Sequence, residues 1–420
     1  MRWARAASGG LMAGALLLAG CTGDGGGQRP ADTGPMTFVT GGDLTDYLRN
    51  VLSEWNRSHP AEKVKVIELP EAADEVRAQM ATGLASGSGR FDVLNIDVTW
   101  TSEFAAAGWI TSLDADRFPL DDFLPPVVDT ATFRGELYAV PYVTNAGLLY
   151  YRKDLLQREG RQPPRTWREL ESMAKSIAPK YGLDGYAGQY LPYEGLTVNI
   201  AEVMQSAGGQ ILSDEGARVT VDSPAAREGL DFLARGVRDG WIPRDALTFK
   251  EEESRRAFQN GDLLFLRNWP YVYDLANEKG SEIAGKVGAV PLPGPNGQGS
   301  SILGGSNLAV NANSRHQKSA NELIAYLTSE RVQRQVLTQG SLPPVRAALY
   351  SDPALVRRFP YLPTLKQSVL TAKPRPKSAH YEQVSLAVQA VAHDALAGRQ
   401  TSDEAVARLA HELRAIVRRG

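Results

Sequence analysis

Two carboxylates stand directly after apolar segments that predict β-strands. The first segment, residues 36–40 (MTFVT), is followed within three residues by Asp43, and the second, residues 91–96 (FDVLNI), runs into Asp97 and Trp100. Ligands of open α/β proteins bind beyond the carboxyl ends of the strands. These positions therefore predict a ligand site that offers hydrogen-bond acceptors and an aromatic ring.

A structural role competes with ligand binding at both carboxylates. A helical pattern begins at Leu44, directly after Asp43, and another resumes at Ser102, shortly after Asp97. Because aspartate is favoured at helix N-caps, either side chain could cap the helix that follows it. The cap is the preferred interpretation for Asp43, and the ligand site is preferred for Asp97.

The segments that would hold these residues alternate between strand and helix patterns. Apolar residues recur at helical spacing from Leu44 to Trp55, and this helix is predicted to stop before Pro60. A second strand is predicted at residues 63–70 and a second helix at about 72–84. Such alternation predicts an α/β fold, with parallel strands joined by crossover helices.

The middle of the chain predicts a second α/β unit. Residues 136–156 form a long β-rich run that contains Pro141. Because proline is excluded from the centre of a sheet, this run is expected to be interrupted there and to pass between domains. Helical patterns follow at residues 167–177, 194–207 and 224–237, and the segment PLPGPNGQGSS predicts turns.

The only cysteine of the chain ends an apolar N-terminal segment. Arg2 and Arg5 precede this segment, which closes with LLLAGC at Cys21. A basic end, a short apolar core and small residues before a cut site are typical of a secretory signal, and Ala-Gly-Cys resembles a bacterial lipobox. We expect residues 1–21 to be a lipoprotein signal peptide, with lipid on Cys21 that anchors the protein to the outer face of the cell membrane. Residues 22–35 are then a flexible tether; the alternatives are a plain secretory signal or a buried first helix.

Composition and motifs exclude several classes of function. The 420 residues include 43% hydrophobic and 22% charged residues, and the formal net charge of −2 gives no electrostatic basis for binding nucleic acid. No later segment is apolar enough over its length to cross a bilayer. The five histidines are scattered, and neither a Gly-x-Ser-x-Gly elbow nor a Gly-Lys-Ser/Thr phosphate loop occurs. We therefore expect no catalytic residue, no metal and no cofactor.

Several motifs occur together in the order and spacing of one protein family. ELYAVPY, PPRTWREL, AFQNGDLLFLRNWP and ILGGSNLAV resemble an extracellular (family 1) solute-binding protein of a carbohydrate ABC importer, and the resemblance covers nearly the whole chain after the tether. A narrower set, FDVLNIDVTWTSEFAAAGW, TNAGLLYYR, NWPYVY and RPKSAHYEQVS, resembles the trehalose-binding lipoproteins of mycobacteria and other actinobacteria. One position departs from that group, because Leu266 stands where the group carries an acidic residue.

The resemblance implies the two-lobed α/β fold of type II periplasmic binding proteins, with a hinge and a ligand cleft between the lobes. The N-terminal lobe would comprise residues 36–143 and 304–346, and the C-terminal lobe residues 147–300 and 347–420. The implied function is capture of a disaccharide, trehalose or a related α-glucoside, by a monomer that delivers it to a membrane permease. The alternatives are another oligosaccharide, a secreted glycoside hydrolase with paired carboxylates, or a lipoprotein that binds a polymer or a protein.

The resemblance also implies which side chains contact the sugar. Carboxylates and amides pair with neighbouring hydroxyls, and an aromatic ring packs on the apolar face of a pyranose. The implied ligand-binding residues are Asp43, Asp97, Trp100, Asn145, Glu194, Trp269, Gly305 and Arg375.

Each of these positions has a structural alternative. Asn145 could satisfy backbone groups at the hinge, and Glu194 could be a solvated charge at a helix start. Trp269 could belong to the core, Gly305 could serve only a turn, and Arg375 could be a surface arginine on a stiff segment between two prolines.

Overall fold

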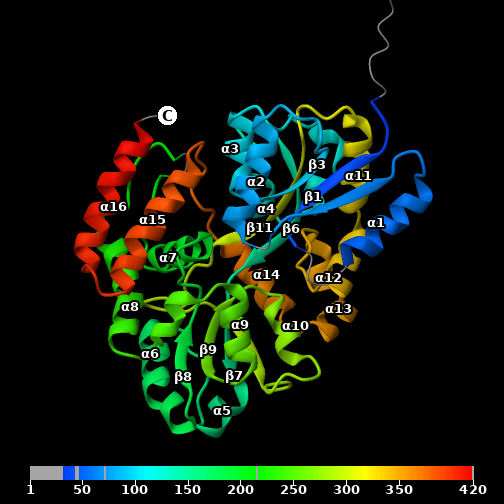
Figure 1. Ribbon diagram of the computed structural model, residues 1–420. Coiled ribbons are helices and arrows are strands. Elements are labelled where there is room, and N and C mark those ends of the chain that lie inside the picture. Colours follow the sequence, from blue (N-terminus) through cyan, green and yellow to red (C-terminus); the bar gives the residue numbers. More distant parts are fainter. Residues whose placement is uncertain (1–31, 43–46, 71, 214–215, 419–420) are drawn as a thin grey trace, which may run out of the picture.

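The protein is represented by a computed structural model that describes residues 32–42, 47–70, 72–213 and 216–418. The predicted signal peptide, and most of the predicted tether, lie outside the described residues. Helices and strands alternate along the chain, and the longer strands form two separate sheets (Figure 1). Among the described residues, no helix has both the length and the apolar character needed to cross a membrane.

The first sheet has five strands in the order β2-β1-β3-β11-β6. Its strands are β1 (Met36–Thr40), β2 (Val64–Glu68), β3 (Val93–Asp97), β6 (Ala139–Ala146) and β11 (Leu303–Val310). Strand β1 pairs in parallel with β2 and β3, which confirms the predicted strand–helix alternation. Strand β11 runs antiparallel to both β3 and β6, so the sheet is mixed.

Helices cover both sides of this sheet. They are α1 (Tyr47–Ser58), α2 (Ala73–Ala85), α3 (Trp100–Ala106), α4 (Pro125–Thr130), α11 (Gln317–Leu327) and α12 (Glu330–Gly340), and a small hairpin is formed by β4 (Thr132–Phe133) and β5 (Glu136–Leu137). Figure 1 shows α2, α3 and α4 on one side of the strands and α1, α11 and α12 on the other. The buried stripe of α1 includes Leu48, Val51, Leu52 and Trp55, as its sequence spacing predicts.

The second sheet has four strands in the order β10-β7-β9-β8. They are β7 (Leu148–Arg152), β8 (Asp184–Ala187), β9 (Leu263–Asn268) and β10 (Val287–Pro291). Strand β7 runs antiparallel to both of its neighbours, and β8 pairs in parallel with β9.

The remaining helices accompany the second sheet or join the two sheets. They are α5 (Lys153–Arg158), α6 (Trp167–Ser176), α7 (Glu194–Ser206), α8 (Pro224–Arg238), α9 (Glu251–Gln259), α10 (Val272–Asn277), α13 (Pro353–Arg358), α14 (Leu362–Thr371), α15 (Tyr381–Leu396) and α16 (Ser402–Val417). Helices α7, α8, α15 and α16 pack on one another at one side of the molecule (Figure 1). Helix α14 contacts both β6 and β10, and it therefore bridges the two sheets.

The chain leaves the first sheet at Gly147, between β6 and β7. Pro141 does not interrupt β6, contrary to the expectation from the sequence, because β6 is an edge strand and the pairing register shifts opposite the proline. A Cβ atom at Gly147 would lie 2.5 Å from Glu202 Oε1 and 2.7 Å from Arg267 Nη2, so the passage between the sheets requires glycine. The β-rich run does pass from one sheet to the other, but at Gly147 and not at Pro141.

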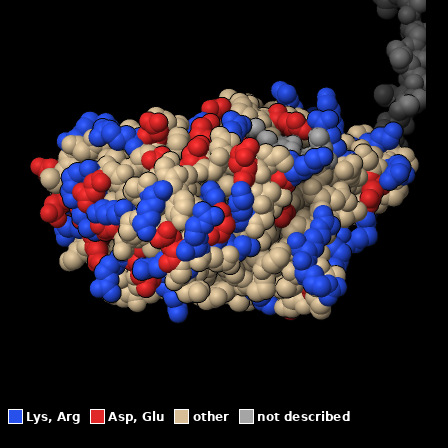
Figure 2. Space-filling model, turned by 90° about the horizontal axis from the view of Figure 1, so that it is seen from below, with Lys and Arg blue, Asp and Glu red and all other residues tan. Residues whose placement is uncertain are grey.

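Charged side chains are distributed over the surface. Figure 2 shows Lys and Arg intermixed with Asp and Glu over most of the face seen from below. This distribution agrees with the small net charge of −2.

Candidate functional site

A cavity of about 390 Å³ lies between the parts of the chain that carry the two sheets. Its walls come from the ends of β1 and β3, from β6 and β11, from the start of α7 and from the segment after β9. Seven residues predicted to contact a ligand line this one cavity: Asp97, Trp100, Asn145, Glu194, Trp269, Gly305 and Arg375. Asp43 and Cys21 lie outside the described residues, although Gly41 and Gly42 line the cavity.

Arg375 joins the two sides of the cavity. Its Nη2 donates to Asp97 Oδ1 and Oδ2 at 3.0 and 3.3 Å, and its Nη1 donates to Glu194 Oε1 at 2.5 Å. The residue is only 4% exposed, so it is not the surface arginine that the sequence left open. Burial alone would lower the pKa of Arg375, but the carboxylates of Asp97 and Glu194 outweigh burial and raise it above its ordinary value.

Asp97 is the last residue of β3 and has two roles in the structure. Its Oδ1 accepts hydrogen bonds from the backbone N and the Oγ1 of Thr99, at 2.9 and 2.6 Å, which fixes the turn after the strand. Helix α3 begins at Trp100 with Thr99 at its N-cap position, so Asp97 is not the helix cap. The same carboxylate still reaches Arg375 across the cavity.

Glu194 is the first residue of α7, and it is buried. Its carboxylate accepts hydrogen bonds from the Tyr381 hydroxyl at 2.6 Å, from Ser385 Oγ at 2.5 Å and from Arg375. The positive end of the helix dipole also favours a carboxylate here. Burial raises the pKa of Glu194, while Arg375 acts in the opposite direction. A solvated charge at the helix start is therefore excluded.

Trp269 follows β9 and presents a half-buried ring to the cavity. Its backbone N donates to Asn268 Oδ1 at 2.7 Å, and its Nε1 points to Glu251 Oε1 at 3.4 Å. A Cβ atom at Gly304 would lie 3.0 Å from the ring, so a strand of the first sheet approaches the tryptophan closely. Trp100 lines the cavity from the opposite side, where it is buried in the core.

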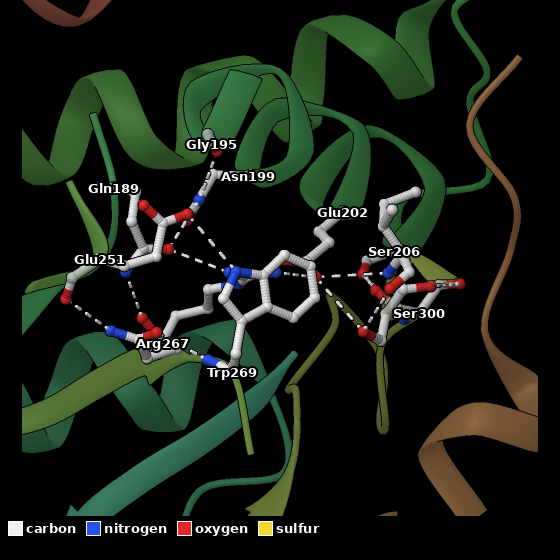
Figure 3. A network of polar contacts seen from close by, with 12 residues as sticks. Gln189, Gly195, Asn199, Glu202, Ser206, Glu251, Arg267, Trp269 and Ser300 are labelled. Atoms are coloured by element: carbon white, nitrogen blue, oxygen red, sulfur yellow. Dashed lines mark hydrogen bonds and ion pairs between the residues drawn. The ribbon is translucent and has the colours of Figure 1, made fainter. Parts of the chain in front are cut away.

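A buried ion pair supports the tryptophan from behind (Figure 3). The guanidinium of Arg267 lies 4.2 Å from the centre of the Trp269 ring and bonds both carboxylate oxygens of Glu202 at 2.6 Å. Its Nη1 donates to Gln189 Oε1 at 2.9 Å, and Asn199 Nδ2 donates to the same oxygen. Burial alone would lower the pKa of Arg267, but the charge of Glu202 raises it. This network holds the ring in place.

Asn145 and Gly305 lie on the paired strands β6 and β11, one residue out of register with each other. Asn145 is paired with Gly304, and Gly305 with Thr144. Gly305 lies within a strand, so the turn alternative is wrong, and its φ of 119° is one that glycine adopts without strain. A Cβ atom there would come 2.1 Å from the carbonyl oxygen of Val143.

The residues that line the cavity but were not predicted from the sequence include Tyr47, Tyr193, Tyr271, Glu251 and Asn95. The hydroxyl of Tyr193 donates to Glu251 Oε2 at 2.6 Å. Glu251 belongs to a run of three glutamates that is typical of a solvated helix start, and nothing in that run distinguishes it. Tyr193 and Tyr271 could have been found, because they stand one and two residues from Glu194 and Trp269.

Two further observations concern metal binding and the choice of the site. Among the residues that the structure describes, no group of three His, Cys, Asp or Glu side chains could hold a metal ion. A larger hollow of about 840 Å³ lies between α8 and the α15–α16 connection. Its described lining residues include none of the predicted ones, and no strand of either sheet lines it. The 390 Å³ cavity therefore remains the candidate site, with paired carboxylates and aromatic rings that suit an uncharged polyhydroxyl ligand.

Comparison with known proteins gives consistent similarities. Residues 41–334 match the family of bacterial extracellular solute-binding proteins. A probable ABC transporter-binding protein of Deinococcus radiodurans is 35% identical over 85% of this chain and 87% of its own length. The mannitol-binding protein of Pseudomonas aeruginosa is 26% identical, with 90% and 91% of the two chains covered.

Solved structures show the same architecture. Maltose-bound MalE3 of T. maritima is 38% identical and has a TM-score of 0.86, with 91% of this chain and 99% of that chain covered. The GacH receptor of Streptomyces glaucescens, at 24% identity, shares the fold with a TM-score of 0.83 over 92% of this chain and 99% of that chain. These similarities confirm the predicted α/β fold of type II periplasmic binding proteins.

Proposed function

The chain belongs to the family of bacterial extracellular solute-binding proteins, and from this premise we propose that it captures a disaccharide, trehalose or a related α-glucoside, for a membrane ABC permease. Members of this family are binding proteins and not enzymes.

The observation that carries the proposal is the position of Arg375 between Asp97 and Glu194. The two carboxylates come from β3 and α7, which lie on opposite sides of the cavity, and the guanidinium contacts both. Charged groups of this kind make the stronger hydrogen bonds to hydroxyls. Both carboxylates are occupied by ion pairing, which favours binding over the acid and base roles that a glycoside hydrolase requires.

The remaining walls suit a sugar. Trp269 offers a ring face to the apolar side of a pyranose, and Trp100 lines the opposite wall. Asn95 Oδ1 is buried in the structure without a hydrogen-bond partner, and a sugar hydroxyl could supply one. The cavity of about 390 Å³ lies within the size range of small-molecule sites, about 300–1,000 Å³.

An α-glucoside is favoured by two independent similarities. MalE3 of T. maritima was solved with maltose, an α-glucoside, bound to it. The motifs around Asp97, Asn145, Trp269 and Arg375 resemble those of trehalose-binding lipoproteins. The mannitol-binding relative, at 26% identity, makes another polyol or oligosaccharide the alternative to be tested.

The proposed mechanism is a shift between open and closed lobes. A sugar that contacts side chains on both sides binds the closed form better, and it therefore shifts the population towards closure. The loaded protein, as a monomer, then docks on the permease. We retain the lobes proposed from the sequence, residues 36–143 with 304–346 and residues 147–300 with 347–420.

The proposed anchor is lipid on Cys21, joined to the body of the protein by residues 22–35. A tether of that length reaches at most about 50 Å when fully extended. The binding cavity would then stay close to the membrane face where the permease lies. Palmitate labelling of cells that express the wild type and Cys21→Ser tests the anchor, and equal labelling of both would refute it.

Isothermal titration of the purified protein with trehalose, maltose, sucrose and glucose tests the function. Micromolar or tighter binding of trehalose, with weak or no binding of glucose, would support the proposal. A signal from another oligosaccharide alone would keep the importer function and overturn trehalose. Sustained release of glucose from the ligand would instead indicate a hydrolase.

A further inference from the structure

A second, smaller cavity adjoins the main one and shares a wall with it. The side cavity, of about 190 Å³, is lined by residues 205, 208–213 and 373–376. Of the described residues, Arg375 is the one that lines both the side cavity and the main cavity. Arg375, which joins Asp97 to Glu194, therefore lies between the two hollows.

This wall is held firmly. Arg375 is flanked by Pro374 and Pro376, whose rings restrict the backbone. The preceding Lys373 donates its N–H to the Ser301 carbonyl at 2.9 Å, and its own carbonyl accepts from Leu303 N at 2.9 Å. With two carboxylates on the guanidinium as well, displacement of Arg375 by a ligand would break contacts with both sides of the main cavity.

The side cavity has the size and polarity to hold one sugar ring. Its volume of 190 Å³ equals that of about six water molecules at about 30 Å³ each, which is comparable with a pyranose. Gln205, Gln210 and Ser213 line it with groups that both donate and accept hydrogen bonds. In the described structure, Gln205 Oε1 is buried without a hydrogen-bond partner, and it could accept a hydrogen bond from a hydroxyl.

We propose that Arg375 sets the length of the bound sugar. With the arginine in place, the main cavity accepts two rings and the side cavity stays closed to the ligand. With a small side chain at this position, the two hollows join and the side cavity becomes a subsite for a third ring. This inference rests on the proposed function, because it assumes that the main cavity binds a disaccharide.

Titration of matched sugars tests the proposal. Maltose is compared with maltotriose, and trehalose with its glucosyl-extended trisaccharide, on the wild type, Arg375→Ala and Arg375→Lys. The wild type should bind the disaccharide about tenfold tighter than the trisaccharide, or more. Arg375→Ala should weaken disaccharide binding and shift the ratio of the two affinities about tenfold towards the trisaccharide. Arg375→Lys keeps the charge and should shift the ratio less.

Gln205→Phe provides the matched control, because it fills the side cavity and leaves the main cavity untouched. Alone it should change disaccharide affinity by less than about twofold, and combined with Arg375→Ala it should cancel the gain for the trisaccharide. An unchanged ratio in Arg375→Ala, or a gain that Gln205→Phe does not cancel, overturns the inference. If thermal melting shows that Arg375→Ala is unfolded, an unchanged ratio in Arg375→Lys overturns it.

The same titrations distinguish a failure of the proposed function, disaccharide binding, from a failure of the proposed role of Arg375. A wild-type protein that binds neither disaccharide refutes the proposed function and, with it, this inference. A wild-type protein that binds a disaccharide, with variants that keep its preference for chain length, refutes only the role of Arg375. A wild-type preference for the trisaccharide also refutes that role.

Discussion

An ion pair between α2 and α15, outside the cavity, is predicted to control affinity through lobe closure. Arg77 on α2 contacts Glu382 on α15 at 2.5 Å, and neither residue lines the cavity. Gln389 of α15 also reaches Asp74 of α2 at 3.4 Å, so the two helices meet in polar contacts. Helix α2 packs beside the first sheet and α15 packs beside α7, on the other side of the cavity (Figure 1). These contacts therefore exist only in a closed form, in which the two sides of the cavity touch.

Glu382→Gln removes this pair selectively. Arg77 remains bonded to Glu103, on its own side of the cavity, so the substitution does not leave the buried guanidinium unpaired. The Arg77 side chain is 11% exposed and that of Glu382 is 45% exposed. An ion pair this exposed stabilises the closed form less than a buried pair would, and we estimate its contribution at about 1 kcal/mol. Loss of that energy from the closed form corresponds to about fivefold weaker sugar binding where the free protein is mostly open.

Isothermal titration with the disaccharide measures the effect, and Glu412→Gln is the matched control. Glu412 pairs with Arg408 inside α16, so its loss does not involve closure. Affinity should fall about fivefold in Glu382→Gln and stay within about twofold of the wild type in Glu412→Gln. The difference should shrink in high salt, which screens partly exposed charges. Equal affinities for both variants and the wild type would refute the idea that this pair stabilises the closed form.

Three further outcomes are expected. Trp269→Ala should weaken sugar binding by about 2 kcal/mol, roughly 30-fold, with a nearly unchanged melting temperature; an affinity within twofold of the wild type would place the ligand elsewhere. Because burial raises the pKa of Glu194, acidification through that raised pKa should protonate its carboxylate and weaken binding; a constant dissociation constant between pH 7 and pH 4 would contradict this. Glu194→Gln should remove that pH dependence. Glu202→Gln leaves the buried Arg267 without its carboxylate partner and should lower the free energy of unfolding, measured in urea, by about 3 kcal/mol. A loss below about 1 kcal/mol would show that the hydrogen bond to Gln189 is enough to stabilise the buried guanidinium.

Local patterns were sufficient to predict the elements that carry the site. The apolar stripe of α1, the buried strand β3 and the helical pattern of α6 depend on neighbours in the sequence, and all three appear near their predicted bounds. The rule that ligands bind beyond strand ends also placed Asp97 and Trp100 at the cavity without knowledge of the fold.

Contacts between distant residues could not be predicted in this way. Arg375 and Asp97 are separated by 278 positions, and only the resemblance to a family suggested that both belong to one site. The pairing of Arg267 with Glu202 was also missed, because an arginine in an apolar strand gives no indication of its partner. Pro141 was misinterpreted because the sequence does not reveal that β6 lies at a sheet edge, where proline is tolerated.

A crystal structure of the protein grown with trehalose would show directly whether the cavity of about 390 Å³ binds this sugar. We expect one disaccharide in the cavity, with hydroxyls bonded to Asp97, Glu194 or Arg375 and a ring packed on Trp269. A sugar bound outside this cavity would contradict the assignment of the site. A cavity without sugar at a saturating concentration would contradict the assignment of trehalose as the ligand.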